Sequence, residues 1–217
     1  LEAAGMKLFN SASAIEVCDD KSLTHIALMN RVPQPKTVLI PLTFPRVGYT
    51  DCTFLEKIAD YLGFPFVIKQ CFGSFGAGVY LAGNMEEAKA ALMKTAGGAA
   101  IAQQYIASSF ARDIRAYVVG DKVAAAMLRH NESGDFRANV AQGGKADAYA
   151  LSEAQAALAV KTAQILGCTF AGVDLLFGEN GEMTVCEVNS NAHFAGISAA
   201  TGVNIADKII EAVAQRI

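Results

Sequence analysis

The chain has 217 residues, of which 53% are apolar and only 18% are charged, and its mean hydropathy is +0.29. This share of apolar side chains is enough to build a core and excludes an intrinsically disordered chain. A formal net charge of −3, without a cluster of Lys or Arg, argues against nucleic acid as a partner. The uncharged stretches are interrupted by Gln, Asn, Ser and His, so we expect no membrane span and no membrane partner.

The cysteines and the start of the chain bear on its origin. The five cysteines are odd in number, widely spaced and in no Cys-x-x-Cys pair. We therefore expect reduced thiols and a cytoplasmic protein rather than a disulfide framework or a cysteine zinc site. Residues 1–19 resemble the interior of a longer protein, which predicts a fragment that has lost an upstream domain. A naturally short protein with a processed start is the alternative.

Helical and strand patterns alternate along the chain. In chain order they predict helix 20–31, strand 37–41, helix 51–62, strand 64–70, strand 79–82, helix 85–95, strand 99–106, strand 113–119, strand 122–129, a polar loop over 131–146, helix 153–166, strand 169–177, strand 182–189 and helix 204–216. The expected helix caps are Thr50 or Asp51, Asn84, the capping box of Ser152 with Gln155, and Asn204. Most strands follow one another as hairpins, with helices on one side, which predicts an α+β protein.

A lysine followed by glycines forms the first candidate site. Lys69 ends an apolar strand, and Gly73, Gly76 and Gly78 follow within ten residues. Glycines let backbone N–H groups approach an anion closely, and a nearby ammonium group adds a point charge. The segment has no Gly-Lys-Ser/Thr ending, so it is not a Walker A loop. A glycine-rich hairpin over phosphates and a mobile surface turn remain equal alternatives.

Two acids and an amide form the second candidate site. Glu187 and Asn189 lie two residues apart on one expected strand and so share a face. A two-residue hairpin turn at Asn180-Gly181 would place Asp174 directly opposite Glu187. Two facing carboxylates beside an amide oxygen favour Mg²⁺ or Mn²⁺ that shares its coordination shell with phosphate. A sheet face of salt bridges to Lys or Arg is the alternative.

A third set of candidates is basic. Arg115 and Arg129 lie on the two strands of an expected hairpin around Gly120-Asp121, and Arg137 follows with Asn139 two residues beyond. Arginines grouped near a metal site can bind phosphate or a substrate carboxylate through two parallel hydrogen bonds. Surface arginines on an antiparallel sheet are the alternative for each residue taken singly.

In this order, the motifs resemble the ATP-grasp superfamily, and specifically its RimK-like carboxylate–amine ligases. The resemblance runs from about Leu8 to the C-terminus and is densest over 111–144 and over AGVDLLF…VCEVN, 171–189. It implies the ATP-grasp fold, in which two α+β subdomains with antiparallel sheets clasp ATP. The implied division is a lead-in over 1–36, a lid subdomain over 37–105 and a C-terminal subdomain over 106–217.

The resemblance also implies a role for each candidate residue. The nucleotide would be held by Lys21, Lys69, the glycine loop with Gly73, Ser74 and Gly76, the hinge residues Gln104 and Tyr105, Asp113, Arg137 and Asn139. The metal ligands would be Asp174, Glu187 and Asn189, and the groups around the reacting atoms would be Arg115, Arg129 and Arg137. Gln104 stands where the family usually has Glu, Gln142 replaces a common Arg, and residues 190–194 replace Ala-Ser-Pro-Gly.

The implied activity is formation of an amide or peptide bond, with ATP and Mg²⁺ or Mn²⁺ and through an acyl phosphate. The partners would be a small-molecule or peptide carboxylate and an amine, with glutamate or another amino acid as the added group, and a homo-oligomer is one assembly open to it. Two alternatives are a phosphotransferase that stops at a phosphorylated product and a non-catalytic module that binds Mg·ATP.

Overall fold

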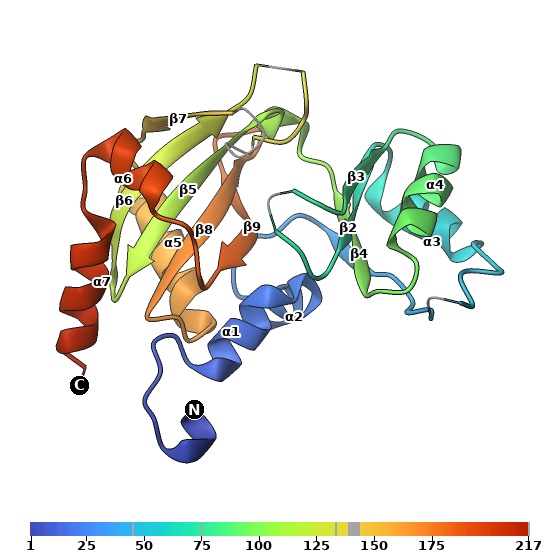
Figure 1. Ribbon diagram of the computed structural model, residues 1–217. Helices are drawn as coiled ribbons and strands as arrows, with labels where there is room; N and C mark the ends of the chain where they lie inside the picture. The colour runs from blue at the N-terminus through green and yellow to red at the C-terminus, as the bar shows by residue number, and fades with distance from the viewer. Residues whose placement is uncertain (45, 75, 133, 139–143, 217) are drawn as a thin grey trace.

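Two antiparallel sheets form the framework of the protein (Figure 1). The computed structural model describes residues 1–216 except 45, 75, 133 and 139–143. One sheet has four strands and the other has five, and helices pack on both. The α+β class predicted from the sequence is therefore confirmed. Two short 3₁₀ turns, Glu2–Ala4 and Ala107–Ser109, complete the regular structure of the described residues.

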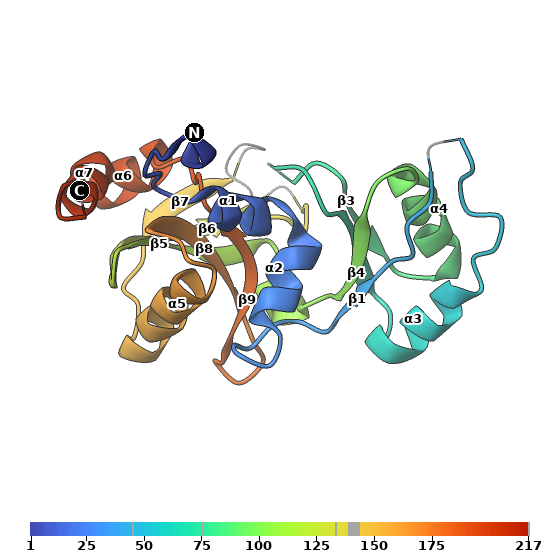
Figure 2. The same cartoon turned by 90° about the horizontal axis from the view of Figure 1, so that it is seen from below.

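The smaller sheet has the strand order β1-β4-β2-β3. Its strands are β1 (Thr37–Leu39), β2 (Phe66–Gln70), β3 (Val79–Ala82) and β4 (Ala100–Gln104). The helices α3 (Phe54–Leu62) and α4 (Met85–Thr95) lie together on one side of it (Figures 1 and 2). Leu55, Phe66, Ile68 and Leu92 are fully buried between these helices and the sheet.

The larger sheet has the strand order β7-β6-β5-β8-β9. Its strands are β5 (Arg112–Val119), β6 (Lys122–His130), β7 (Lys145–Ala148), β8 (Phe170–Phe177) and β9 (Met183–Asn189). The helix α5 (Glu153–Ile165) covers one face, and two helices lie on the other face (Figure 1). Of these, α6 (Ala195–Thr201) packs near β6 and β7, and α7 (Ile205–Ala214) packs near β5 and β6.

Alternation along β5 separates the core of the larger sheet from its polar face. Ile114, Ala116 and Val118 are fully buried in the core on the α5 side. Asp113 and Arg115, on either side of Ile114, point the opposite way because successive side chains of a strand alternate. One strand therefore supplies both the core and a charged surface that faces the smaller sheet.

Two helices near the N-terminus join the two halves. The helix α1 (Ala12–Asp19) is followed directly by α2 (Lys21–Leu28), and Figure 2 shows α2 between β9 and β4. Asp20 ends α1 in an extended conformation and caps α2, since its carboxylate accepts hydrogen bonds from the backbone N–H groups of Ser22 and Leu23. This bend makes Lys21 the first helical residue of α2 and directs it towards the space between the sheets.

Most of the predicted elements and caps are confirmed. Asn84 accepts the N–H of Glu87, Ser152 and Gln155 form the expected capping box, and Asn204 caps α7. The hairpin around Gly120-Asp121 pairs Val119 with Lys122, as its two-residue turn requires. The predicted cap at Thr50 or Asp51 is displaced, because α3 begins only after Thr53.

Three elements were not predicted. Residues 1–19 contain α1, β7 occupies residues 145–148 at the end of the segment expected to be a polar loop, and α6 follows β9. The helix predicted over 20–31 is α2, which is shorter than predicted. It ends at Leu28, and Asn30 has a positive φ of 60° that a helix does not allow. The division of the chain into three parts at residues 36 and 105 stays a prediction.

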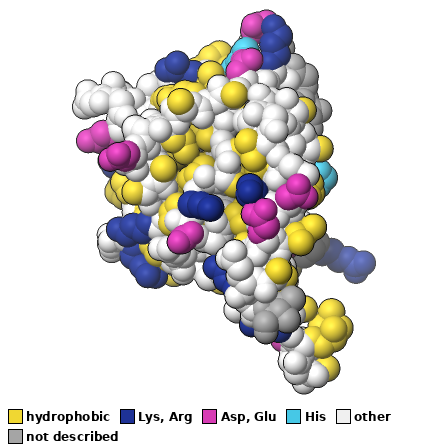
Figure 3. All heavy atoms as spheres, turned by 90° about the vertical axis from the view of Figure 1, so that its left-hand side faces the viewer, with side chains coloured by type: hydrophobic (Ala, Val, Ile, Leu, Met, Phe, Trp, Pro, Cys, Tyr) yellow, Lys and Arg dark blue, Asp and Glu magenta, His cyan; other side chains and the backbone are white. Residues whose placement is uncertain are grey.

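The outer surface beside α6 and α7 carries charges of both signs. Figure 3 shows basic and acidic side chains interspersed with hydrophobic ones on this face, without one large area of a single sign. Among the described residues, no helix is both long and apolar enough to cross a lipid bilayer.

Candidate nucleotide and metal site

A cavity of about 620 Å³ opens between the two sheets. Small-molecule sites in proteins commonly enclose about 300–1,000 Å³, so this space suits a nucleotide with a substrate beside it. Every described residue predicted to bind nucleotide or metal, or to act in the reaction, lines this cavity. Asn139 lies outside the described residues. The described lining has six basic and four acidic side chains, which favours an anionic ligand.

The glycine-rich segment forms one wall of this cavity. It connects β2 to β3, where the backbone N–H of Gln70 donates to the carbonyl of Gly78 at 2.9 Å. Gly73, Gly76 and Gly78 have φ values of 130°, 74° and 68°, in the region that favours glycine. The segment extends from the smaller sheet towards the larger one (Figure 1). Of the two alternatives, this arrangement favours a glycine-rich hairpin that covers a bound ligand and not a surface turn without a ligand.

Lys21 connects α2 to the glycine-rich segment and to the larger sheet. Its ammonium group donates to the carbonyl of Gly73 at 3.0 Å and lies 3.3 Å from a carboxylate oxygen of Glu187. The side chain of Lys21 is 15% exposed, so this ion pair is largely shielded from water. A residue predicted to bind nucleotide thus contacts a residue predicted to bind metal.

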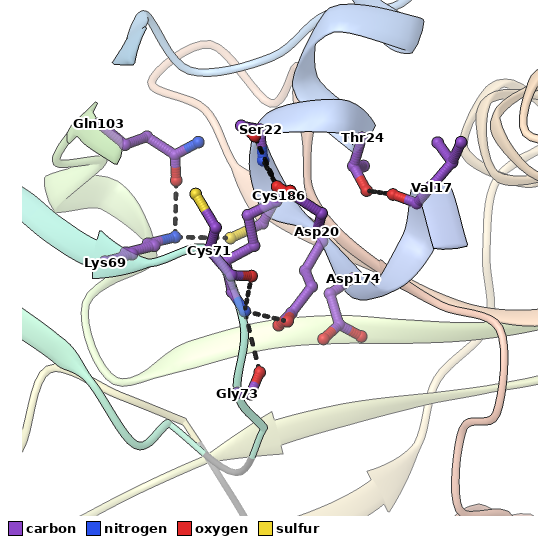
Figure 4. A network of polar contacts seen from close by, with 12 residues as sticks. Val17, Asp20, Ser22, Thr24, Lys69, Cys71, Gly73, Gln103, Asp174 and Cys186 are labelled. Carbon is purple, nitrogen blue, oxygen red and sulfur yellow. Dashed lines mark hydrogen bonds and ion pairs between the residues drawn. The ribbon is translucent and has the colours of Figure 1, made fainter. Parts of the chain in front are cut away.

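Lys69 is held by two residues that the sequence reasoning missed, Gln103 and Cys186 (Figure 4). Its ammonium group donates to the side-chain oxygen of Gln103 at 2.6 Å and lies 3.6 Å from the sulfur of Cys186. The amide of Gln103 also donates to the hydroxyl of Thr37 at 3.0 Å, so the buried glutamine is fixed at both ends. Gln103 stands opposite Val67 in the ladder, two residues from Lys69, and this spacing is the signal that could have revealed it.

Asp174 and Glu187 face each other across β8 and β9, as predicted. The predicted turn is wrong, however, because Gly178 donates to the carbonyl of Glu182 and the turn has three residues, 179–181. That turn alone would shift the pairing by one residue. A bulge lies between the pairs Leu175–Val185 and Asp174–Glu187, with Cys186 as the extra residue, and it restores the predicted register.

The bulge also accounts for the position of the Cys186 thiol. Cys186 has no opposite residue in the ladder, and its sulfur lines the same cavity as Glu187. Burial raises the pKa of the Cys186 thiol, although the nearby ammonium of Lys69 acts in the other direction. Two other thiols, Cys18 and Cys168, lie in the core of the larger sheet with their sulfurs 3.5 Å apart.

Asp174 is held by two arginines. Arg115 donates from Nε to Oδ1 and from Nη2 to Oδ2, both at 2.7 Å, and Arg129 donates to the same Oδ2 at 2.9 Å. Arg129 also forms two bonds to Asp113, of 2.6 and 2.7 Å. The four side chains form a charge-balanced network on the polar face of β5, β6 and β8, with side-chain exposures of 5–16%. The salt-bridged sheet face, the alternative to the metal, is therefore present.

The electrostatic environment keeps Asp174 ionised. Burial raises the pKa of the Asp174 carboxyl, but the guanidinium groups of Arg115 and Arg129 outweigh burial and hold that pKa below its usual range. For the same reason the two neighbouring carboxylates raise the pKa of Arg129. The cavity thus contains a carboxylate that keeps its charge at neutral pH.

The hinge and the segment after β6 close the cavity on its remaining side. Gln104 ends β4 and its backbone N–H donates to the carbonyl of Lys36, and the ring of Tyr105 packs edge-on against Phe136 with centroids 6.2 Å apart. Arg137 pairs with Asp135 and donates from Nη1 to the carbonyl of Gly76 at 3.0 Å. Arg137 therefore ties the larger sheet to the glycine-rich segment.

The donor set is chemically suited to a hard divalent cation. Asp174, Glu187 and Asn189 lie on adjacent strands, share one face and offer only oxygen ligands apart from the amide nitrogen. The side-chain nitrogen of Asn189 is buried and has no hydrogen-bond partner among the described residues, so no bond of that nitrogen holds the amide in its present orientation. The described residues contain no group of three His, Cys, Asp or Glu side chains placed to hold a metal. Part of the coordination shell would therefore come from Asn189, water and a ligand.

Comparison with known proteins identifies the family. Residues 18–213 match a family model described as the RimK-like ATP-grasp domain. The chain belongs to the RimK-like ATP-grasp family. This RimK-like chain is 37% identical over 218 residues to a probable alpha-L-glutamate ligase of Legionella pneumophila, covering 100% of this chain and 70% of that protein. It is 44% identical over 209 residues to another of Picosynechococcus, covering 93% of this chain and 65% of that protein.

Solved structures confirm the ATP-grasp fold of the RimK-like chain. The ATP-grasp ligase PsnB, solved with a phosphomimetic variant of its minimal precursor, Mg and ADP, superposes with a TM-score of 0.73. The match covers 100% of this chain and 65% of PsnB, at 19% identity. At that identity the likeness establishes the fold, and the chain spans about two thirds of the PsnB chain.

Proposed function

We propose that the chain carries the nucleotide- and metal-binding site of an ATP- and Mg²⁺-dependent carboxylate–amine ligase. The observation that carries this proposal is the single 620 Å³ cavity, in which the glycine-rich segment, Lys21, Lys69, the arginines and the two facing acids meet. Membership of the RimK-like family and the names of the two glutamate ligases support it.

The proposed reaction joins a carboxylate to an amine in two stages. A substrate carboxylate oxygen attacks the γ-phosphorus of ATP, the bond to the bridging oxygen breaks, and ADP leaves with that electron pair. The amine then attacks the acyl carbon, the C–O bond to phosphate breaks, and the amide and inorganic phosphate are formed. The amine loses one proton in this stage, to the departing phosphate or to solvent. Glutamate is the amino acid that the relatives' names favour as the added group.

In this proposal the protein positions the reactants and neutralises charge. Lys69 and Arg137 bind phosphate oxygens beneath the glycine-rich segment, and the backbone at Gln104 and Tyr105 contacts the base. Asp174, Glu187 and Asn189 would hold Mg²⁺, which would supply positive charge next to the phosphates. The segment over 71–78 excludes water, since an acyl phosphate would otherwise hydrolyse.

The reaction products test this function. We expect the complete gene product, given ATP, Mg²⁺ and pairs of amino acids or peptides, to release ADP and inorganic phosphate in equal amounts, with one amide per turnover detected by mass spectrometry. A phosphotransferase would yield ADP and a phosphorylated product without free phosphate. A non-catalytic module would bind Mg·ATP without turnover stimulated by any pair.

Variants of the acids provide the matched control. Glu187→Gln removes one proposed metal ligand and is expected to lower the turnover rate by at least about a hundredfold, in line with the loss of one group that stabilises charge in the transition state. Glu179→Gln removes the same charge from the exposed turn between β8 and β9 and should leave turnover unchanged. Equal activity of the two variants would contradict the proposed site.

A further inference from the structure

Arg115 and Arg129 are not equivalent in their hold on Asp174. Arg115 makes both of its carboxylate hydrogen bonds to Asp174. Arg129 makes two bonds to Asp113 and only one to Asp174. Losing Asp174 would therefore cost Arg115 its whole carboxylate partner within the described residues, whereas Arg129 would keep the stronger part of its pairing.

The two oxygens of Asp174 also differ. Oδ1 accepts one bond, from Nε of Arg115, while Oδ2 accepts bonds from both arginines. A cation that approaches the carboxylate competes most easily for the oxygen with fewer bonds. The contact that gives way first is then the Nε bond of Arg115, which breaks the paired geometry of that arginine.

On the basis of the function proposed above, we propose that Asp174 passes from Arg115 to the metal ion when the metal–nucleotide complex binds, and that the freed Arg115 guanidinium binds the carboxylate substrate. Before binding, Arg115 keeps the buried carboxylate compensated. After binding, the same guanidinium is an unpaired cation facing the cavity. The metal–nucleotide complex and the carboxylate substrate therefore bind with positive cooperativity.

The surroundings of Arg115 permit this exchange. Its side chain passes over Gly172, where an added Cβ would lie 3.5 Å from its Cδ and Nε. Because position 172 of β8 is glycine, the aliphatic part of Arg115 packs against backbone and not against a side chain. The Arg115 side chain lines the cavity and is 16% exposed. Asn189 and Ala192, at the end of β9 and just beyond it, line the cavity near the same strand.

Hydrogen exchange at the two guanidinium groups tests the exchange directly in the unmodified chain. The Nε–H groups of Arg115 and Arg129 both donate to buried carboxylates, so both should exchange slowly with water and give NMR signals without ligand. Adding Mg·ADP should accelerate exchange at Arg115 by at least about tenfold, while Arg129, held by Asp113, stays protected and acts as an internal control. Equal protection of Arg115 before and after binding would overturn the inference.

Metal affinity in variants provides a second test, in which replacing a residue of the site is expected to tighten metal binding. Arg115→Lys keeps the charge but removes the paired hydrogen bonds, so Mn²⁺ in the presence of ADP should bind about tenfold more tightly than in the unmodified chain. Arg115→Ala should show the same direction, and Arg31→Ala, which removes an exposed arginine after α2, should match the unmodified chain. Unchanged or weaker Mn²⁺ binding in Arg115→Lys overturns the inference and leaves the proposed function intact. Absence of Mn²⁺·ADP binding in the unmodified chain overturns both.

Discussion

Replacing Arg129 by Met removes the residue that joins two buried carboxylates. Arg129 makes three charge-assisted hydrogen bonds, of 2.6, 2.7 and 2.9 Å, to Asp113 and Asp174, and its side chain is 9% exposed. Met fills most of the volume but leaves Asp113 without its cation and Asp174 with Arg115 alone. Breaking a buried ion pair from one side costs about 3–5 kcal/mol, so we expect a loss of that size in the free energy of unfolding at pH 7.

Arg137→Met is the matched control. Arg137 also pairs with an aspartate, Asp135, but the two side chains are 29% and 30% exposed. Ion pairs this open to water contribute about 0–1 kcal/mol. Because the chain has no Trp, urea unfolding is best followed by far-ultraviolet circular dichroism. A loss in Arg129→Met no larger than the loss in Arg137→Met would refute the view that the network is buried and energetically coupled.

The pH dependence of the stability of Arg129→Met tests the direction of these pKa shifts. In the unmodified chain Asp174 has a lowered pKa, so its contribution to stability is full above the unfolded value of about 3.9 and is lost as the pH falls through the folded value. Burial already raises the pKa of Asp113 in the unmodified chain, although Arg129 opposes it. Without Arg129 the pKa of Asp113 rises further, whereas Asp174 keeps Arg115 as its partner. Lowering the pH from 7 to 5 should therefore recover more stability in Arg129→Met than in the unmodified chain. A further loss in the variant on acidification would contradict this assignment.

The remaining predictions concern single contacts. Gly172→Ala places a Cβ 2.7 Å from that of Ala192 and should lower the free energy of unfolding by about 1–3 kcal/mol in urea. The hydroxyl of Tyr117 donates to the carbonyl of Ala192, and burial raises the pKa of Tyr117 to about 12. Its contribution to stability is therefore full below about pH 10 and is lost as the pH rises through 12. Tyr117→Phe should reduce the fall in melting temperature over that pH range. Asn84→Ala removes the bond to the N–H of Glu87 and should cost about 1 kcal/mol in the same urea assay.

Local signals in the sequence were sufficient for most of the framework. Caps such as Asn84 and Ser152 act within three residues, and the turn at Gly120-Asp121 sets the pairing of the residues next to it, Val119 with Lys122 and Val118 with Val123. The predicted pairing of Asp174 with Glu187 is correct because two features that were not predicted offset each other. The turn has one residue more than predicted, and the bulge at Cys186 adds one residue on the other strand. A bulge has no local sequence signal here, so the agreement depends on packing that the turn rule does not describe.

The missed elements depend on contacts distant in sequence. The helix α6 has seven residues with Gly196 among them, and it is held by Ile197, which is fully buried against the larger sheet. The strand β7 has the sequence Lys-Ala-Asp-Ala, and only its pairing with β6 makes it a strand. For α1 a local signal was present, since the Ser11 side chain accepts the N–H of Ala14 as a cap.

The ion network shows where strand patterns stop being informative. The turn at Gly120-Asp121 alone would set Arg129 opposite Arg112. A bulge between the pairs Val118–Val123 and Tyr117–Ala125 shifts the register by one residue, so that Arg129 lies opposite Asp113 and shares the polar face with Arg115. The partner of Arg115 depends on the pairing of β5 with β8, which sets Arg115 opposite Asp174 across some 60 residues of chain. Metal ligand and salt-bridge partner were therefore weighed as alternatives for Asp174. In the structure Asp174 forms salt bridges with Arg115 and Arg129, and in our proposal the same carboxylate is a metal ligand. The proposal therefore treats the two roles as successive states of one side chain, with Arg115 as the group that moves between them.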